Sequence, residues 1–430
     1  MRYYSLNRQS PDVDFREAAI RGQAPDKGLY FPAQLPKLEQ SFIRQLEQIS
    51  KEELAYKIMK PYIGNCIDDS VLHSIVAETI NFPFPLVPVN EKIYSLELFH
   101  GPTLAFKDVG ARFMSRCLGY FSKGLNKKTT VLVATSGDTG GAVANGFFGV
   151  DAVEVVILYP SGKVSPVQEL QLTTCGQNII ALEVKGSFDD CQAMVKDAFM
   201  DDELQRKLQL TSANSINVAR WLPQQLYYFF AWQQWPDKQN PPVISVPSGN
   251  FGNICAGLLA KYSGLPVRSF IAACNINDTV SDYLGTGTHT PKTTVSTVSN
   301  AMDVGNPSNL IRIIELFKQD GRHADKVLQS VTVTDVETID CIRQVYEKYN
   351  YLLDPHGAVA FTAFTKKLHI HQAGIFLETA HPVKFPEAIQ EAIEKKPEVP
   401  DTILPLFHLQ KQSIIMKNSF ADLKEWLLNR

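Results

Sequence analysis

Hydrophobic positions along this chain follow two kinds of pattern. In residues 41–63, apolar side chains recur every three or four positions, which is the spacing of an amphipathic helix. Residues 81–90 contain three prolines, which excludes a helix interior and predicts an extended segment. We therefore expect residues 1–90 to form a mostly helical N-terminal region.

Beyond residue 90, short runs rich in Val, Ile and Leu alternate with helical patterns. The clearest candidates for buried strands are residues 129–135, 153–160, 241–248, 268–275 and 373–380. Continuous apolar strands that alternate with helices are typical of a parallel sheet covered on both faces. The predicted fold class is therefore α/β, with the helical region at the N-terminus.

Composition narrows the function classes. The 430 residues are 44% hydrophobic, which is enough for two or more packed domains. Lys and Arg number 42 against 45 Asp and Glu, so we expect no basic face for nucleic acid. Nothing in the sequence implies a protein partner.

The seven cysteines are scattered singly, without a CxxC pair, which predicts neither disulfides nor a metal site and favours a reducing compartment. The first ten residues lack the apolar core of a signal peptide. No apolar run approaches the roughly 18 residues of a membrane span. We expect a cytoplasmic protein that does not enter a membrane.

Two predicted strands run into glycine-rich turns that precede helices. Val131 to Thr135 enters residues 136–141 (SGDTGG), and Val243 to Val246 enters residues 248–253 (SGNFGN). Such turns direct backbone N–H groups and the positive end of a helix dipole at one point, which favours an anion. Neither loop is GxGxxG or GxxxxGK[ST], so NAD and ATP are disfavoured. The alternative is that both are ordinary tight turns.

A third predicted strand, residues 375–377, ends just before Thr379 and His381. Open α/β sheets bind ligands at the carboxyl ends of their strands, so the Thr379 hydroxyl is expected at the same crevice. His381 is interpreted as a hydrogen-bonded loop histidine in preference to a catalytic base.

Lys107 follows the apolar residues Leu104 to Phe106 at an expected helix start. A lysine in apolar surroundings loses solvation as an ammonium, so its pKa falls and its neutral amine becomes a nucleophile toward aldehydes. The alternative is a surface ion pair between Lys107 and Asp108. One lysine, two anion-binding turns and a hydroxyl at a third strand end are together explained by pyridoxal phosphate.

These residues resemble the threonine synthase family, in its compact, effector-independent form, among the fold-type-II pyridoxal-phosphate enzymes. The resemblance runs nearly end to end, through FREAAIRGQAPDKGLYFP, FHGPTLAFKD, ATSGDTGGAVA, PSGNFGN, NDTV, LLDPHGAVA and ETAHPVKFPEAI. It implies two open, mostly parallel twisted sheets with helices on both faces. It also implies a small domain over residues 91–170, which carries the lysine and the SGDTG loop, and a large domain over residues 171–430.

The resemblance implies that Lys107 forms the Schiff base and that Thr379 faces the ring nitrogen. The residues expected to cradle the cofactor phosphate are Ser248, Gly249, Asn250, Phe251, Gly252 and Asn253. Those expected to bind the substrate carboxylate are Ser136, Gly137, Asp138 and Thr139. Many relatives outside the subgroup have Asn where this chain has Asp138. A carboxylate beside the cofactor's ring oxygen is repulsive, so Asp138 either points elsewhere or holds a proton.

The reaction implied is conversion of O-phospho-L-homoserine and water to L-threonine and phosphate, with Lys107 as general base. Candidates for the substrate phosphate are Lys163, Ser165, Arg220 and, more weakly, Asn217. Each also has an ordinary interpretation as loop surface or helix face. Two other functions remain open: a phospholyase that releases a keto acid with phosphate, and a catalytically inactive binding protein.

Overall fold

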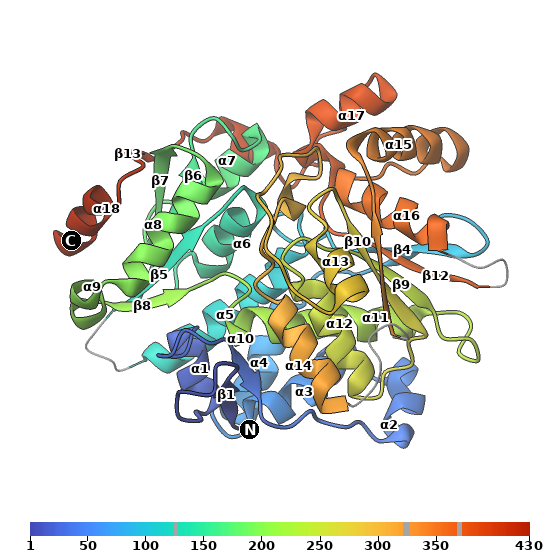
Figure 1. Ribbon diagram of the computed structural model, residues 1–430, viewed down its shortest axis with the longest axis horizontal. Helices are drawn as coiled ribbons and strands as arrows, with labels where there is room; N and C mark the ends of the chain where they lie inside the picture. The colour runs from blue at the N-terminus through green and yellow to red at the C-terminus, as the bar shows by residue number, and fades with distance from the viewer. Residues whose placement is uncertain (124–127, 321–326, 368–371) are drawn as a thin grey trace.

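The computed structural model describes residues 1–123, 128–320, 327–367 and 372–430. Figure 1 shows two sheets side by side, with the N-terminal helices packed beneath them. The two sheets have six and five strands, and helices cover both faces of each. The α/β fold class predicted from the sequence is confirmed, as are all five predicted strands.

The N-terminal region is mostly helical, as predicted, with one short antiparallel strand pair. Its elements are β1 (Tyr3–Ser5), α1 (Phe15–Arg21), β2 (Tyr30–Pro32), α2 (Gln40–Gln45), η1 (Leu46–Gln48), α3 (Lys51–Ile63) and α4 (Asp69–Thr79). The helical pattern of residues 41–63 is divided into three elements. The division has a local cause, because the Ser50 side chain accepts a hydrogen bond from the backbone N–H of Glu53 and starts α3 as its N-cap.

The six-stranded sheet has the order β11-β10-β9-β12-β4-β3 and is parallel except for the pair β3 and β4. Its strands are β3 (Leu86–Pro88), β4 (Ile93–Glu97), β9 (Val243–Pro247), β10 (Ser269–Cys274), β11 (Leu328–Thr332) and β12 (Gly374–Glu378). One face packs against α15 (Asp335–Tyr349), α16 (Pro355–Lys367) and α17 (Pro386–Ile393). The other face packs against α11 (Leu226–Gln234), α12 (Gly252–Tyr262), α13 (Thr279–Thr286) and α14 (Leu310–Asp320).

The five-stranded sheet has the order β13-β7-β6-β5-β8 and is parallel throughout. Its strands are β5 (Thr129–Ala134), β6 (Val153–Pro160), β7 (Ile179–Lys185), β8 (Gln209–Ser212) and β13 (Ile414–Lys417). The helices α8 (Phe188–Met200), α9 (Asp202–Lys207) and α18 (Phe420–Leu428) cover one face. The helices α5 (Lys107–Ser122), α6 (Asp138–Phe147) and α7 (Pro166–Thr173) contribute to the core on the other.

The remaining short helices lie in connections between these elements: α10 (Val218–Trp221), η2 (Leu222–Gln225), η3 (Asn300–Met302), η5 (Pro382–Lys384) and η6 (Leu404–His408). In the described part of the chain, no helix is both long enough and apolar enough to cross a membrane.

Membership of the two sheets does not follow the expected borders at residues 90 and 170. Strand β4 belongs to the six-stranded sheet although it lies within residues 91–170. Strands β7, β8 and β13 belong to the five-stranded sheet although they lie beyond residue 170. The chain therefore passes between the sheets more than once. Parallel strands are joined by crossovers, so neighbours in a sheet need not be neighbours in sequence.

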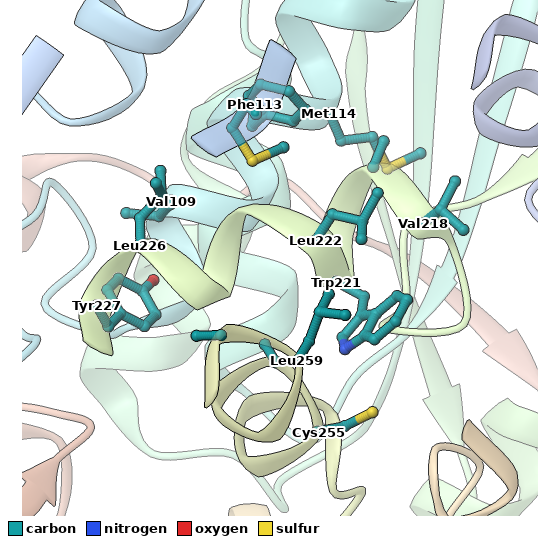
Figure 2. Packing of buried hydrophobic residues seen from close by; sticks show 14 of the residues in the cluster. Val109, Phe113, Met114, Val218, Trp221, Leu222, Leu226, Tyr227, Cys255 and Leu259 are labelled. Carbon is teal, nitrogen blue, oxygen red and sulfur yellow. The ribbon is translucent and has the colours of Figure 1, made fainter. Parts of the chain in front are cut away.

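One hydrophobic core is shared by α5 and α12, two helices that begin at the site. Figure 2 shows Val109, Phe113 and Met114 of α5 on one side of the segment 218–227, and Cys255 and Leu259 of α12 on the other. The indole of Trp221 in this segment is fully buried. Because α5 begins at Lys107 and α12 begins at Gly252, this core fixes the start of each helix relative to the other.

Candidate active site

A cavity of about 1050 Å³ opens where the two sheets meet. It is lined by residues that follow β5 and β8 of the five-stranded sheet and β9 and β12 of the six-stranded sheet. Strand carboxyl ends are the usual ligand site of open α/β sheets. The lining includes most of the residues predicted for the site: Lys107, Ser136, Asp138, Thr139, Arg220, Gly249, Asn250, Phe251, Gly252, Asn253 and Thr379.

Lys107 is the first residue of α5, as predicted. The loop before it is tied to the segment after β12, because the Phe106 N–H donates to the Thr379 carbonyl at 2.9 Å. Asp108 does not form the surface ion pair considered as an alternative. Its carboxylate is buried and accepts hydrogen bonds from the Thr103 N–H at 2.9 Å and the Thr103 hydroxyl at 2.5 Å. The Lys107 Nζ instead lies 3.6 Å from Asp138 Oδ2.

The SGDTG loop joins β5 to α6 in a turn that requires glycine. Gly137 has φ +140°, and a Cβ there would lie 2.4 Å from the carboxamide carbon of Gln168. The Thr135 hydroxyl oxygen accepts hydrogen bonds from the N–H groups of Gly137 and Gly140 at 2.9 and 2.8 Å. The loop is thereby fixed with Ser136, Asp138 and Thr139 at the cavity, where the start of α6 provides a site for an anion.

The SGNFGN loop joins β9 to α12 and is the second turn that the sequence predicts to bind an anion. A Cβ at Gly249 would lie 2.5 Å from the Cα of Met302, so the backbone of Met302 packs directly on the loop. Asn250 is anchored by the Ser308 N–H, which donates to its Oδ1 at 2.6 Å. The Asn253 Oδ1 accepts from the Tyr228 hydroxyl at 2.8 Å.

Asn253 supplies an observation that fits a phosphate. Its Nδ2 is buried and has no hydrogen-bond partner among the described residues, while the side chain lines the cavity. A buried amide donor without an acceptor is unfavourable, so the site is suited to a ligand that brings an oxygen. The Ser248 hydroxyl, in contrast, donates to the Val246 carbonyl at 2.8 Å, and Ser248 is absent from the described cavity lining.

Thr379 and His381 both follow β12 but have different surroundings. Thr379 lines the cavity and is nearly buried. His381 Nδ1 accepts a hydrogen bond from the Val383 N–H at 3.1 Å and caps η5. Burial lowers the pKa of His381 to about 4, and the charge of His100 adds to this effect. The imidazole is therefore neutral near pH 7, as expected for a hydrogen-bonded loop histidine.

Arg220 is a buried cation at the cavity wall. Its Nη1 donates to the Lys107 carbonyl at 3.3 Å, while its Nε has no partner among the described residues. Burial lowers the pKa of Arg220 to about 10, so the guanidinium remains charged near pH 7. A charged donor group with an unused N–H is suited to an anionic ligand.

The other three candidates for the substrate phosphate are not brought to the cavity. In the described structure, Lys163, Ser165 and Asn217 are absent from its lining. Ser165 is the N-cap of α7 in a reciprocal pair of hydrogen bonds with Gln168. Asn217 is the N-cap of α10, and its Nδ2 donates to the carbonyls of Ala19 and Ser212. Hydroxyl and amide side chains at helix starts are commonly used in this way.

Lys384 is a residue of this region that the sequence analysis missed. Its side chain is 0% exposed, and its Nζ donates to Asp138 Oδ1 at 2.8 Å. Gln168 Nε2 donates to the same oxygen at 3.0 Å. Burial alone raises the pKa of Asp138, but the charges of Lys384 and Lys107 outweigh it and hold that pKa well below its usual range. Asp138 therefore faces Lys107 as a carboxylate and not as a protonated acid.

The signal that could have identified Lys384 is present in the sequence. Lys384 lies between Val383 and Phe385 just beyond a buried strand, which is the same pattern of an isolated lysine among apolar residues that drew attention to Lys107.

Three family models together match residues 2–427 of this chain. A model described as "Threonine synthase N terminus" matches residues 2–80. One described as "Pyridoxal-phosphate dependent enzyme" matches residues 81–375, and one described as "Threonine synthase, C-terminal" matches residues 357–427.

Comparison with individual proteins points to the same family. The threonine synthases of Haemophilus influenzae and Escherichia coli are 45% and 43% identical to this chain, over the full length of each. The crystal structure of the Escherichia coli enzyme superposes with a TM-score of 0.94 at 42% identity and covers both chains completely. A threonine synthase from Brucella melitensis, solved with bound pyridoxal phosphate, superposes with a TM-score of 0.93 at 35% identity over 100% of this chain and 99% of the other.

Proposed function

Because this chain belongs to the threonine synthase family, we infer that it converts O-phospho-L-homoserine and water to L-threonine and phosphate, with pyridoxal phosphate as cofactor. The reaction makes it a carbon–oxygen lyase that acts on a phosphate ester. The observation that carries this inference is the convergence of Lys107 and two anion-binding turns on one cavity. The seven cysteines are all free, which supports a reducing compartment such as the cytoplasm.

The residues at the cavity fit the cofactor. Lys107 would hold it covalently, the loop of residues 248–253 would hold its phosphate, and Thr379 would face its ring nitrogen. The unpartnered Asn253 Nδ2 and the start of α12 supply N–H groups for the phosphate. When bound, pyridoxal phosphate supplies an aldehyde that condenses with an amine and a ring that delocalises negative charge from the substrate Cα.

Lys107 Nζ is the proposed carrier of protons. Burial lowers the pKa of Lys107, the charge of Asp138 opposes this, and the charges of Lys384 and Arg220 add to the lowering. An amine with a lowered pKa has a larger neutral fraction near pH 7, and only the neutral amine can accept a proton. Once free, Nζ would accept the proton from the substrate Cα and deliver protons in the later steps.

The substrate would be held by groups that complement its two anionic ends. The backbone N–H groups at the start of α6, in the segment of Ser136, Gly137, Asp138 and Thr139, would bind the substrate carboxylate. Arg220 would bind the phosphate group that leaves, because its charge strengthens the contact as negative charge develops.

The test is an absorbance spectrum of the purified holoenzyme mixed with O-phospho-L-homoserine, with phosphate, threonine and keto acid measured in the same sample. We expect a visible band that responds to substrate, with threonine and phosphate formed in equal amounts. Lys107→Ala should lose both the visible band and the formation of products. Lys424→Ala, a surface substitution, should keep the band and the products. Phosphate with keto acid would instead identify a phospholyase, and a colourless protein after addition of pyridoxal phosphate would contradict the cofactor.

A further inference from the structure

Lys384 is a fully buried cation that the proposed reaction does not use. It ends η5, six residues beyond the end of β12, and Nζ contacts Asp138 of α6 at 2.8 Å. In the described structure it is absent from the cavity lining. A buried ammonium costs several kcal/mol of desolvation unless it is paired, so the position of Lys384 depends on Asp138.

The two oxygens of Asp138 have different partners. Oδ1 accepts from Lys384 Nζ at 2.8 Å and from Gln168 Nε2 at 3.0 Å. Oδ2 lies 3.6 Å from Lys107 Nζ, which is an ion-pair distance but longer than a hydrogen bond. Lys384 and Gln168 therefore fix the orientation of the carboxylate and leave one oxygen directed at Lys107.

We propose that Lys384 is a positioning residue that fixes the Asp138 carboxylate and neutralises its charge, so that Lys107 remains able to lose its proton. The proposal rests on the proposed role of Lys107 as the lysine that binds the cofactor. Lys384 acts through Asp138 and does not itself touch the cavity.

The balance of charge around Lys107 shows why a second cation is needed. Asp138 on α6 attracts the proton of Lys107, whereas Lys384 on η5 and Arg220 on α10 repel it. The neighbouring Asp108 is engaged with Thr103. With Lys384 removed, Asp138 would be a carboxylate with Lys107 as its nearest cation, and the pKa of Lys107 would rise.

Two further titratable groups near this cluster are neutral near pH 7. The Tyr227 hydroxyl donates to the Phe106 carbonyl, and burial raises the pKa of Tyr227 well above its usual value. Burial lowers the pKa of His381 to about 4. Neither group replaces the positive charge of Lys384.

The pair also explains how an aspartate can occupy position 138. An asparagine there would be neutral and would not repel an oxygen anion of a bound cofactor. Asp138 and Lys384 together carry no net charge, so the pair approaches the electrostatics of an amide while keeping a carboxylate oxygen beside Lys107.

The test measures proton affinity at Lys107. Full-length protein is freed of its cofactor, and the rate at which added pyridoxal phosphate attaches is followed by visible absorbance over about pH 6 to 10. Only the neutral amine attacks the aldehyde, so the rate has an inflection at the pKa of Lys107. Lys384→Met, which keeps the length of the side chain without its charge, should move the inflection up by about one pH unit or more.

Two controls separate charge from packing. Lys384→Arg keeps the charge and should leave the inflection within about half a pH unit of wild type. Lys424→Met removes a lysine that pairs with Asp201 at 2.7 Å outside the described cavity lining, and should have no effect. An unchanged inflection in Lys384→Met would overturn the proposal.

If Lys384→Met fails to fold or to bind the cofactor, a double variant decides whether charge or packing is the cause. This variant, Asp138→Asn with Lys384→Met, removes both charges. Recovery in the double variant supports charge compensation, whereas continued failure means that Lys384 acts by packing and overturns the proposal. A wild-type protein without a visible band would contradict the proposed function itself, which keeps the two failures distinguishable.

Discussion

Arg220 is the residue at which burial, charge and an unused donor coincide. Its guanidinium is charged and almost fully buried, and its Nε has no partner among the described residues. We predict that Arg220→Met lowers kcat/KM for O-phospho-L-homoserine about 10²- to 10³-fold, because one charged contact to the leaving phosphate is lost. Steady-state kinetics measure this effect, and the visible cofactor band should be unchanged.

Matched variants test whether the contact is to substrate. Arg220→Lys keeps the charge without the planar fork and should recover part of the lost rate. Arg343→Met removes a surface ion pair with Asp340 and should leave the kinetics unaltered. If Arg220→Met kept kcat/KM within about threefold of wild type, Arg220 would be a structural residue only.

His381 predicts a dependence of stability on pH. Its pKa is about 4 in the folded protein against an ordinary value of 6.5, so between these values the unfolded chain binds a proton that the folded chain does not. The free energy of unfolding should therefore fall as pH decreases from about 6.5 to 4, with at most about 3 kcal/mol from His381.

His381→Asn isolates this contribution, because Asn also caps a helix start but does not titrate. Denaturant unfolding at several pH values should show a weaker loss of stability in this variant between about pH 6.5 and 4. His408→Asn, at an exposed position, should behave as wild type. Identical pH dependence in wild type and His381→Asn would contradict the prediction.

At the scale of elements, the site depends on two turns that precede α6 and α12. In the turn before α6, Gly137 has a backbone conformation that other residues rarely adopt, and a Cβ there meets Gln168 at 2.4 Å. We predict that Gly137→Ala destabilises the protein by about 1–3 kcal/mol through backbone strain and displaces Gln168 from Asp138. Thermal unfolding and kcat/KM should both decrease.

Gly149→Ala is the matched control for this turn. Gly149 also has positive φ, +70°, but a Cβ there meets no atom within 4 Å. The control should lower the thermal stability through backbone strain but leave kcat/KM unchanged. Equal kinetic losses in the two variants would mean that the turn before α6 has no special role.

At the scale of the whole molecule, Asp138 and Lys384 connect the two sheets beside the cavity. Asp138 follows β5 of the five-stranded sheet, and Lys384 follows β12 of the six-stranded sheet. We predict that Lys384→Met and Asp138→Asn each lower the free energy of unfolding by about 3–5 kcal/mol, because each leaves a buried charge without its main partner. The double variant should lose clearly less than the sum.

A denaturant-unfolding double-mutant cycle measures this coupling. Lys424→Met removes a partly exposed ion pair with Asp201 and should lower the free energy of unfolding by at most about 1 kcal/mol. Additive losses at Asp138 and Lys384 would show that the two sheets are not coupled through this pair.

Several features of this protein follow from sequence alone. The five apolar runs, the glycine-rich turns after two of them and Lys107 at a helix start were all predicted, and the structure has each of them. These features depend on side-chain periodicity and on turn chemistry, which act between residues close together in the chain.

Tertiary structure decided the features that depend on distant partners. The pairing of β4 with β12 and the distribution of strands between the two sheets require the folded chain. The contact that gives Asp138 its charge state joins positions 246 residues apart. Local pattern therefore determined which residues form five of the strands, the two glycine-rich turns and the helix start at Lys107. Only the fold determined which charges meet in the interior, because desolvation and Coulomb energy depend on distance in space and not on separation along the chain.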